Sequence, residues 1–351
     1  MANVMRTLVD TNMPSIFDNT QDLARYCWTS HSGDSFFYCN NPETIDFSDL
    51  ADSGKFLTRN GVLGAGSLYT WHCNNTQKTI HSVILIYNPD TVPIHVTLTN
   101  IGLTNQASGS DRTAWENYYT GGSSETVTVA PGGYASVLSQ VIPNGNVFGK
   151  IAKYNIKFEG EPGPGFAYFY DLVYYQDSSS AVDFAIGDNP GNGLINSRRR
   201  GVGEWYQNDL TVTRIDLTEE LPARAVTIGG IYAQTDNFMD SFLGDDMVEI
   251  VGGSGRPNEH DNGFLYGAYG LPIKMTFRIN NETDQDREVR IFMGCENTSV
   301  PVMAFYNGEF FHADNGSYVA AGKVRDVITL GVIPAYRSRE ITFETANLAQ
   351  S

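Results

Sequence analysis

A pattern of extended segments separated by turns occurs twice in this chain, far apart in the sequence. The first copy covers residues 83–90 (VILIYNPD) and 94–99 (IHVTLT), and the second covers residues 273–281 (IKMTFRINN) and 288–293 (EVRIFM). Roughly 50 residues after each hairpin-like pair, the tripeptide Val-Ile-Pro recurs, at 141–143 and at 332–334, and an extended stretch follows the proline. Such long-range self-similarity predicts two copies of one β-domain.

Length and composition agree with this prediction. A chain of 351 residues is long enough for two domains that each bury a core. Hydrophobic residues at 41% and charged residues at 18% describe a globular protein. The chain also has 35 glycines and an aromatic share of 12%, which suits strands joined by tight turns.

Short strands broken by Gly, Pro and Asn turns predict an all-β fold of two tandem antiparallel β-sandwich domains, jelly-roll-like, with an irregular N-terminal arm. Residues 1–60 form the arm and irregular segment, with one short helix at 18–26. The first sandwich covers residues 61–176, a linker rich in Ser, Gly and Asn covers 177–208, and the second sandwich covers 209–351. The uniformly apolar run 83–87 is expected to be a central strand, and the alternating run 94–99 to have one wet face.

The charge of the chain limits its partners. A formal net charge of −17 disfavours nucleic acid. A basic run, Arg198-Arg199-Arg200, is interpreted as a solvated loop or as an acceptor for the acidic surface of a neighbouring copy. The sequence has no apolar run long enough for a membrane span, and its first twenty residues lack the features of a secretory signal. We nevertheless expect the protein outside the cell or on a cell or spore surface.

Four cysteines allow two interpretations. Cys27 and Cys39 could close a short disulfide loop, which leaves Cys73 and Cys295 for links between molecules; alternatively, all four are reduced core residues. Zinc could be held by four of the five donors Cys27, His31, Cys39, His72 and Cys73. The spacing lacks a short Cys-x-x-Cys pair, so a disulfide or buried thiols are favoured, and no metal ligand is assigned.

No motif assigns a reaction to the chain. The sequence has no Gly-x-Ser-x-Gly elbow, its six histidines are scattered, and no pair stands out among its 40 acidic residues. We therefore predict that the protein is not an enzyme and assign it no catalytic or cofactor-binding residue. Calcium in the acidic turns, among them Asp284, Asp286 and Glu288, is the one cofactor that stays open.

A group of aromatic residues, Trp115, Tyr118 and Tyr119, follows a polar turn and could form a platform for a glycan ring. Packing in a core or an interface is the alternative interpretation of the same residues. The platform gives the alternative function, a carbohydrate-binding surface protein whose partner is a cell-surface or spore polysaccharide.

Several segments resemble a family of surface-associated proteins from spore-forming Bacillota, often labelled by an attached copper amine oxidase-like domain. The resemblance lies in residues 68–75 (LYTWHCNN), 83–88, 96–102, 127–132 (VTVAPG) and 141–145 (VIPNG), and in residues 199–201 and 269–272 of the second half. It implies a surface location but no oxidase activity. The quinone-forming context of such oxidases is an Asn-Tyr followed by an acidic residue, and here Asn117-Tyr118 is followed by Tyr119.

The function predicted from these observations is a structural, self-assembling protein of a bacterial surface: a subunit of a filament, of a spore appendage or coat, or of a surface layer. Its partners would be copies of itself, joined by strand addition and contacts between sheet edges. The residues expected at these contacts are Asn3, Val4, Met5, Leu8, Ile16 and Phe17 of the arm, and Arg198, Arg199 and Arg200.

Overall fold

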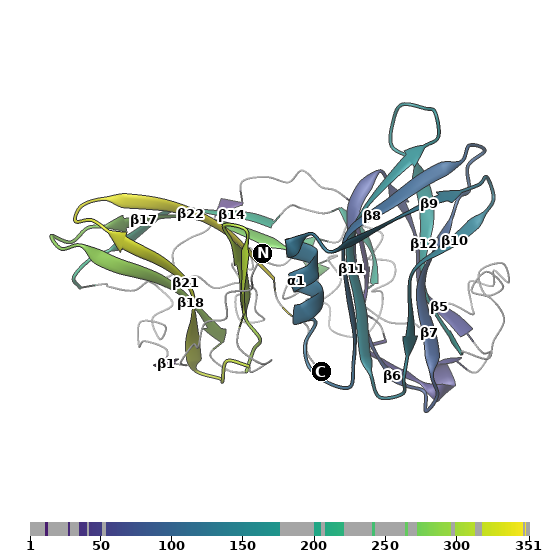
Figure 1. Cartoon of the computed structure of the whole chain (residues 1–351), viewed down its shortest axis with the longest axis horizontal. Coiled ribbons are helices and arrows are strands. Elements are labelled where there is room, and N and C mark those ends of the chain that lie inside the picture. Colours follow the sequence, from purple (N-terminus) through teal and green to yellow (C-terminus); the bar gives the residue numbers. More distant parts are fainter. Residues whose placement is uncertain are drawn as a thin grey trace. The chain divides into compact units, whose positions relative to one another are not determined.

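The computed structural model describes residues 11–12, 27–28, 35–40, 42–50, 54–175, 200–204, 208–220, 241–242, 264–265, 272–295, 299–312, 318–346 and 348. These residues are almost all in β-strands, with one α-helix, α1 (Arg112–Thr120), and one short 3-10 helix (Phe47–Leu50) (Figure 1). The all-β prediction is therefore confirmed. No helix in the described part is long and apolar enough to cross a membrane. The predicted helix at 18–26 lies outside the described residues.

The chain divides into two compact units. The N-terminal unit comprises Ser32–Tyr206 and Phe242–Leu265, and the C-terminal unit comprises Met1–His31, Gln207–Ser241 and Tyr266–Gln350. The first residues of the chain thus belong with its second half. The pair β15 (Ser241–Phe242) and β16 (Phe264–Leu265) forms a separate two-stranded sheet.

The N-terminal unit contains two sheets. One has the order β10 (Tyr134–Ile142), β7 (Ile80–Tyr87), β12 (Phe166–Tyr175) and β5 (Gly54–Leu63). The other has the order β13 (Arg200–Glu204), β3 (Ser35–Cys39), β6 (Ala65–Asn75), β11 (Val147–Phe158), β8 (Ile94–Gln106) and β9 (Ser123–Val129), and β4 (Thr44–Asp46) also pairs with β6. Below, they are the four-stranded and the seven-stranded sheet.

The C-terminal unit also contains a short and a long sheet. The short sheet has the order β1 (Thr11–Asn12), β21 (Lys323–Ile333) and β18 (Arg287–Cys295). The long sheet has the order β2 (Cys27–Trp28), β14 (Asn208–Leu217), β17 (Ile273–Asn281), β22 (Ser338–Thr345), β19 (Met303–Tyr306) and β20 (Glu309–His312).

The two long sheets have the same strand order and the same strand directions. The parallel pair β3–β6 corresponds to the parallel pair β14–β17, and every other neighbouring pair along the two orders is antiparallel. The sequence repeat thus reflects a repeated sheet topology. The correspondence is shifted from the one predicted, because β17–β18 matches β6–β7 rather than β7–β8. The predicted hairpins were also wrong: β7 and β8 lie in different sheets, as do β17 and β18.

The first strand of each long sheet is a short strand that comes, in the chain, just before a strand of the other long sheet. β2 comes just before β3 in the chain but pairs with β14, and β13 comes just before β14 but pairs with β3. β13 lies within the predicted linker 177–208, so part of that linker is a sheet strand. Each long sheet is therefore completed by a strand that is distant in the sequence from the strand it pairs with.

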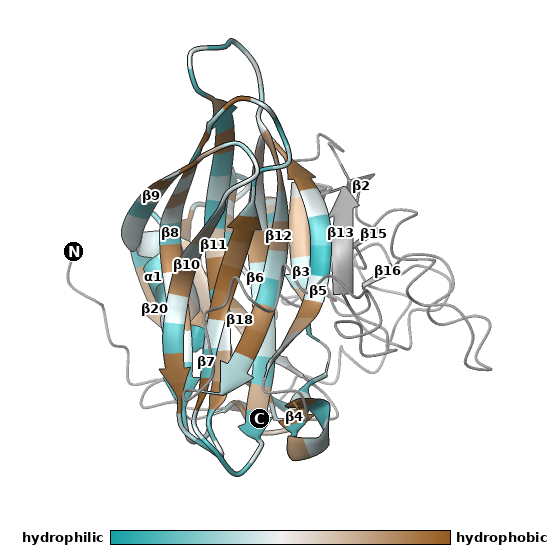
Figure 2. Ribbon diagram, turned by 90° about the vertical axis from the view of Figure 1, so that its right-hand side faces the viewer, coloured by the Kyte–Doolittle hydropathy of each residue, from teal (hydrophilic) through white to brown (hydrophobic). Residues whose placement is uncertain are grey.

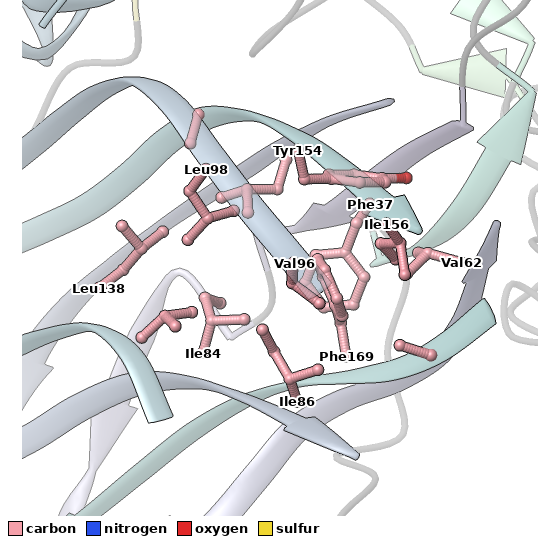
Figure 3. Packing of buried hydrophobic residues seen from close by; sticks show 14 of the residues in the cluster. Phe37, Val62, Ile84, Ile86, Val96, Leu98, Leu138, Tyr154, Ile156 and Phe169 are labelled. Atoms are coloured by element: carbon pink, nitrogen blue, oxygen red, sulfur yellow. The ribbon is translucent and has the colours of Figure 1, made fainter. Parts of the chain in front are cut away.

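The core of the N-terminal unit lies between its two sheets. A large apolar cluster takes residues from both sheets, among them Leu68 and Val96 of the seven-stranded sheet and Ile84 and Phe169 of the four-stranded sheet (Figure 3). Residues of β8 alternate between buried and partly exposed from Ile94 to Thr99, as predicted. Brown and teal bands along several strands in Figure 2 mark this alternation, which follows from the two-residue period of a strand.

Strand β7 is buried on both faces, as its uniformly apolar sequence predicts. Ile84 and Ile86 face the other sheet, while Val83 and Leu85 belong to a second cluster with Tyr170 and other residues of the four-stranded sheet. Aromatic side chains pack around this second cluster. Tyr87 stacks on Tyr134 with ring centroids 4.7 Å apart, and His81 stacks on Tyr174 at 5.0 Å.

Helix α1 packs on β8 and β11, and its approach is close. A Cβ atom at Gly102 of β8 would lie 2.0 Å from the carbonyl oxygen of Ala114, so only glycine fits there. Trp115 of the helix is fully buried, and its Nε1 donates a hydrogen bond to Asp111 Oδ2 at 3.0 Å. The hydroxyl of Tyr69 on β6 donates to the same oxygen at 2.7 Å.

Three buried asparagines, Asn74, Asn88 and Asn281, each clasp a turn to the end of another strand. Each Oδ1 accepts the backbone N–H of the residue two positions later, and each Nδ2 donates to the carbonyl of the residue four positions later. The same Nδ2 also donates to a distant carbonyl, which is that of Ile142 for Asn74, Val129 for Asn88 and Ile333 for Asn281. Such an Asx turn suits asparagine, whose amide carries both donors and an acceptor. The clasps of Asn74 and Asn281 hold the backbone of the two Val-Ile-Pro segments.

We expect Asn74→Ala to destabilise the N-terminal unit by about 2–4 kcal/mol, because it removes the donor of the buried hydrogen bond to the Ile142 carbonyl and one of the donors to the Lys78 carbonyl. Denaturant unfolding of the full chain measures the change. The matched control is Asn75→Ala, since Asn75 is exposed and bonds to Asp46 at the surface. Equal effects of the two substitutions would contradict the role of the clasp.

Candidate functional site

A layer of ionisable and polar side chains crosses the core of the N-terminal unit. Its members are Cys39 of β3, His72 of β6, Ser82 of β7, Lys150 of β11 and Asp171 of β12, and each is buried with a relative exposure of 0–1%. We call this group the polar layer. It joins the two sheets, because Ser82 and Asp171 belong to the four-stranded sheet and the others to the seven-stranded sheet.

The period of the strands places these side chains between the sheets. On β11, Phe148, two positions before Lys150, belongs to a third apolar cluster that also contains Ile80 and Val173. Ala152, two positions after Lys150, belongs to the large cluster between the sheets. Asp171 on β12 and Ser82 on β7 are flanked in the same way. Since residues two apart share a face of a strand, all three polar side chains face the core, where they separate the two apolar clusters.

Hydrogen bonds connect the layer around the Asp171 carboxyl. His72 Nε2 lies 2.9 Å from Asp171 Oδ2, and His72 Nδ1 lies 2.7 Å from the carbonyl oxygen of Pro42. Lys150 Nζ donates to Ser82 Oγ and lies 3.7 Å from Asp171 Oδ1. The thiol of Cys39 is a further hydrogen-bond donor to the carboxyl.

The bond to Pro42 fixes the protonation of the histidine–aspartate pair. A carbonyl oxygen only accepts, so His72 Nδ1 carries a hydrogen. The contact between Nε2 and Asp171 Oδ2 then needs one further proton, held by the nitrogen or by the oxygen. In both arrangements the pair has no net charge, as either imidazolium with carboxylate or imidazole with carboxylic acid.

The same reasoning makes Lys150 a neutral amine. The His72–Asp171 pair is already neutral, so an ammonium at Lys150 would be an uncompensated charge in an interior that water does not reach. Burial lowers the pKa of Lys150 from its usual value, in agreement with this argument. Burial raises the pKa of the Asp171 carboxyl, whereas a positive charge on Lys150 and hydrogen bonds from His72 and Cys39 would lower it.

The donor atoms of Cys39, His72 and Asp171 lie within 4.8 Å of one another, so a metal ion has to be considered. Around a tetrahedral zinc ion with bonds of 2.0–2.3 Å, neighbouring ligand atoms would be about 3.3–3.7 Å apart. The 2.9 Å between His72 Nε2 and Asp171 Oδ2 is a hydrogen-bond distance instead. The geometry therefore describes a hydrogen bond between His72 and Asp171, which are closer together than two ligands of one zinc ion would be.

The predicted cysteine pairing is corrected. Cys39 and Cys73 are thiols in the structure, so Cys39 is not in a disulfide with Cys27. Among the five predicted zinc donors, only Cys39 and His72 come together. Cys73, next to His72 on β6, occupies the opposite face of the strand, Cys27 belongs to β2 of the other unit, and His31 lies outside the described residues. For Cys295, only the backbone in β18 is described.

The predicted glycan platform is also corrected. Trp115 and Tyr118 are 0% and 3% exposed, so neither ring can stack on a sugar. They lie on α1, and Tyr119 stacks on Trp115 with ring centroids 5.7 Å apart. The alternative interpretation, packing in the core, is the one that the structure supports.

The other predicted contact and cofactor residues are mostly outside the described part. Asn3, Val4, Met5, Leu8, Ile16, Phe17, Arg198 and Arg199 are not described, and Arg200 is described only as a backbone position in β13. Among the acidic turns considered for calcium, the one with Asp284, Asp286 and Glu288 is described. There Asp286 accepts the N–H of Ala335 and Glu288 pairs with Arg290, so these carboxylates do not converge.

Sequence analysis missed Lys150, Asp171 and Ser82. A signal for them exists: Asp171 is the only charged residue of its aromatic strand, FAYFYDLVYY. Lys150 has the same parity along β11 as the buried Ala152, Tyr154 and Ile156, whereas Lys153 and Lys157 have the opposite parity. A charge on the apolar face of a strand indicates a buried partner, although it does not name that partner.

Comparisons with known proteins add little. No family model matches the chain. No curated protein matches it. Among solved structures, the PBSX exported protein XepA shows a TM-score of 0.17 at 8% identity over 87% of this chain and 88% of its own. The multicopper oxidase Fet3p has a TM-score of 0.12 at 8% identity, and the match covers 80% of this chain and 50% of Fet3p. The coconut allergen cocosin has a TM-score of 0.12 at 10% identity, and the match covers 98% of this chain and 87% of cocosin. These values carry no argument about function, and the resemblance to surface proteins of Bacillota stays a prediction.

Cys73 offers a test of the thiols. Burial and the nearby carboxylate of Asp46 raise the pKa of Cys73, which slows its reaction at neutral pH. In a Cys27→Ser/Cys295→Ser background, we expect Asp46→Asn to speed labelling of Cys73 by iodoacetamide about two- to fivefold. Asp90→Asn, at the far end of the sandwich, is the control. An unchanged rate would show that Asp46 does not influence this thiol.

Proposed function

We propose that the protein is a structural subunit that assembles with copies of itself on a bacterial cell or spore surface. The observation that supports the proposal is that short strands from the first 28 residues pair with sheets formed by the last 150 residues. β1 pairs with β21, and β2 pairs with β14. A sheet completed by a distant part of its own chain can equally be completed by the same part of another chain.

Exchange of these strands has a low free-energy cost. β1 and β2 are two residues long each, so few backbone hydrogen bonds have to open before another strand takes the place. β13, which precedes β14 in the chain, pairs in the same manner with the distant strand β3. When the donor and the acceptor sheet belong to different molecules, head-to-tail contacts repeat without closing and yield a filament.

A structural role also agrees with the burial of the reactive groups. His72, Lys150 and Asp171 are the described groups best placed for proton transfer or nucleophilic attack, and each is 0–1% exposed. A substrate has no access to them in this fold, so we propose no enzymatic activity.

Carbohydrate binding has less support. Trp115 and Tyr118 of the predicted platform are buried, and tyrosines of the four-stranded sheet use their ring faces to stack on one another, as in the pair Tyr87–Tyr134. A sugar ring stacks on a free aromatic face. We therefore do not retain this alternative.

Deleting residues 1–17 removes β1 and should abolish or strongly shorten polymers seen by negative-stain microscopy of the full-length protein, because the edge of β21 loses its added strand. Circular dichroism and thermal unfolding of the truncated protein serve as the control for folding. Polymers of unchanged length would exclude β1 from assembly, and a full-length protein that stays monomeric at high concentration would contradict the whole proposal.

Disulfide trapping can show whether β2 comes from a neighbouring molecule. Thr211 of β14 is the register partner of Cys27. In a Cys73→Ser/Cys295→Ser background, one form keeps Cys27 and the other carries Cys27→Ser with Thr211→Cys. Mixed and oxidised, the two forms should yield a covalent dimer on a non-reducing gel, because a strand-exchanged pair aligns the two thiols.

The control places the cysteine at Thr213, two residues along the same face of β14 and outside the register with β2. Dimers with Thr211→Cys and not with Thr213→Cys would support strand exchange. Exclusively monomeric protein in both mixtures would contradict it.

A further inference from the structure

We propose that Lys150 and Asp171 become joined by an intramolecular amide bond between their side chains, formed by the protein itself after folding. The bond would link β11 of the seven-stranded sheet to β12 of the four-stranded sheet through the core of the N-terminal unit. The proposal rests on the geometry of the polar layer and is independent of how the protein assembles.

The amine and the carboxyl are direct neighbours. Lys150 Nζ lies 3.7 Å from Asp171 Oδ1, which is longer than a hydrogen bond and places the amine beside the carboxyl group whose carbon it would attack. Asp171 Oδ1 is buried and has no hydrogen-bond partner among the described residues. A buried acceptor in this state is costly, and the surrounding sheets hold the amine and the carboxyl together.

The protonation state derived above is the one that condensation needs. A neutral amine is a nucleophile, whereas an ammonium is not. The proton shared between His72 Nε2 and Asp171 Oδ2 moves along a contact of 2.9 Å, and on the oxygen it makes the carboxyl an acid whose carbon an amine can attack. The low polarity of the core favours uncharged reactants and an uncharged product over an ion pair.

The step balances without a co-reactant. The Lys150 Nζ attacks the Asp171 Cγ, a C–N bond forms, and the bond from Cγ to Oδ2 breaks. Oδ2 leaves with the proton that it shared with His72 and with one proton from the amine, so that one water is released. Oδ1 becomes the carbonyl oxygen of the amide, and His72 keeps the hydrogen that it donates to Pro42. Proximity supplies the activation, because both groups are already positioned by the two sheets.

The product also suits the site better than the reactants do. A neutral amide replaces two ionisable groups that the core solvates poorly. The new bond closes a ring from residue 150 to residue 171 and fixes the two sheets to each other. A covalent link of this kind raises resistance to unfolding by constraining the unfolded chain, as a disulfide does, but reductants do not break it.

The intact mass of the reduced, denatured full-length protein tests the proposal. We expect a mass lower than that of the sequence by one water, about 18 Da. Trypsin should then fail to cut after Lys150 and release residues 113–153 covalently joined to residues 158–198. A mass equal to that of the sequence, with separate peptides ending at Lys150, would overturn the proposal. This measurement uses the native sequence, so it does not depend on whether a variant folds.

Variants locate the bond. Lys150→Met and Asp171→Ala should each restore the full mass, because each removes one reactant, whereas Lys153→Met, three residues along the same strand, should leave the deficit unchanged. A deficit that persists in both Lys150→Met and Asp171→Ala would place the lost water elsewhere and contradict the proposal. His72→Gln should lower the cross-linked fraction of the folded protein, and His81→Gln on the opposite face of its sheet should not.

Discussion

The hydrogen bond from His72 Nδ1 to the carbonyl of Pro42 constrains the whole interior of the N-terminal unit. It directs the other ring nitrogen at Asp171 with a proton between them, and this neutral pair leaves no anion to balance a charge on Lys150. The core can contain these groups because each has a partner and because the layer as a whole is uncharged. Three separate ions would carry a large desolvation cost in this core, whereas an uncharged layer can be buried in a tightly packed sandwich.

A repeated framework surrounds this layer. Both long sheets have the same order and directions of strands, and a buried asparagine holds the Val-Ile-Pro segment in each unit. The polar layer itself belongs to the N-terminal unit. The features that the two units share, the strand order and the asparagine clasps, fix the path of the backbone. They do not depend on which side chains fill the core. This division supports a scaffold whose two halves keep one architecture and differ in their interiors.

Sequence patterns predicted the fold class because strand periodicity and turn residues are local signals. They identified the duplicated Val-Ile-Pro but matched β17 and β18 to the wrong strands of the first half. The sequences of β17 and β18 differ from those of their true counterparts, β6 and β7, more than the turn between β17 and β18 differs from the turn between β6 and β7. The exchange of β2 and β13 could not be predicted, because strand pairing depends on contacts far apart in the sequence. Trp115 was misplaced for a related reason: its polar neighbours hide a short helix that packs on the sheet.

The polar layer could be predicted only in part from the sequence, because a charge on the apolar face of a strand indicates a buried partner, but Lys150 and Asp171 lie on different strands and nothing in the sequence pairs them. Neutron diffraction from crystals of the full-length protein would test the account most directly, because it locates hydrogens. We expect a hydrogen on His72 Nδ1 that points to the carbonyl of Pro42, and fewer than three hydrogens on Lys150 Nζ. Three hydrogens on Nζ, or a bare Nδ1, would contradict a neutral core and everything built on it.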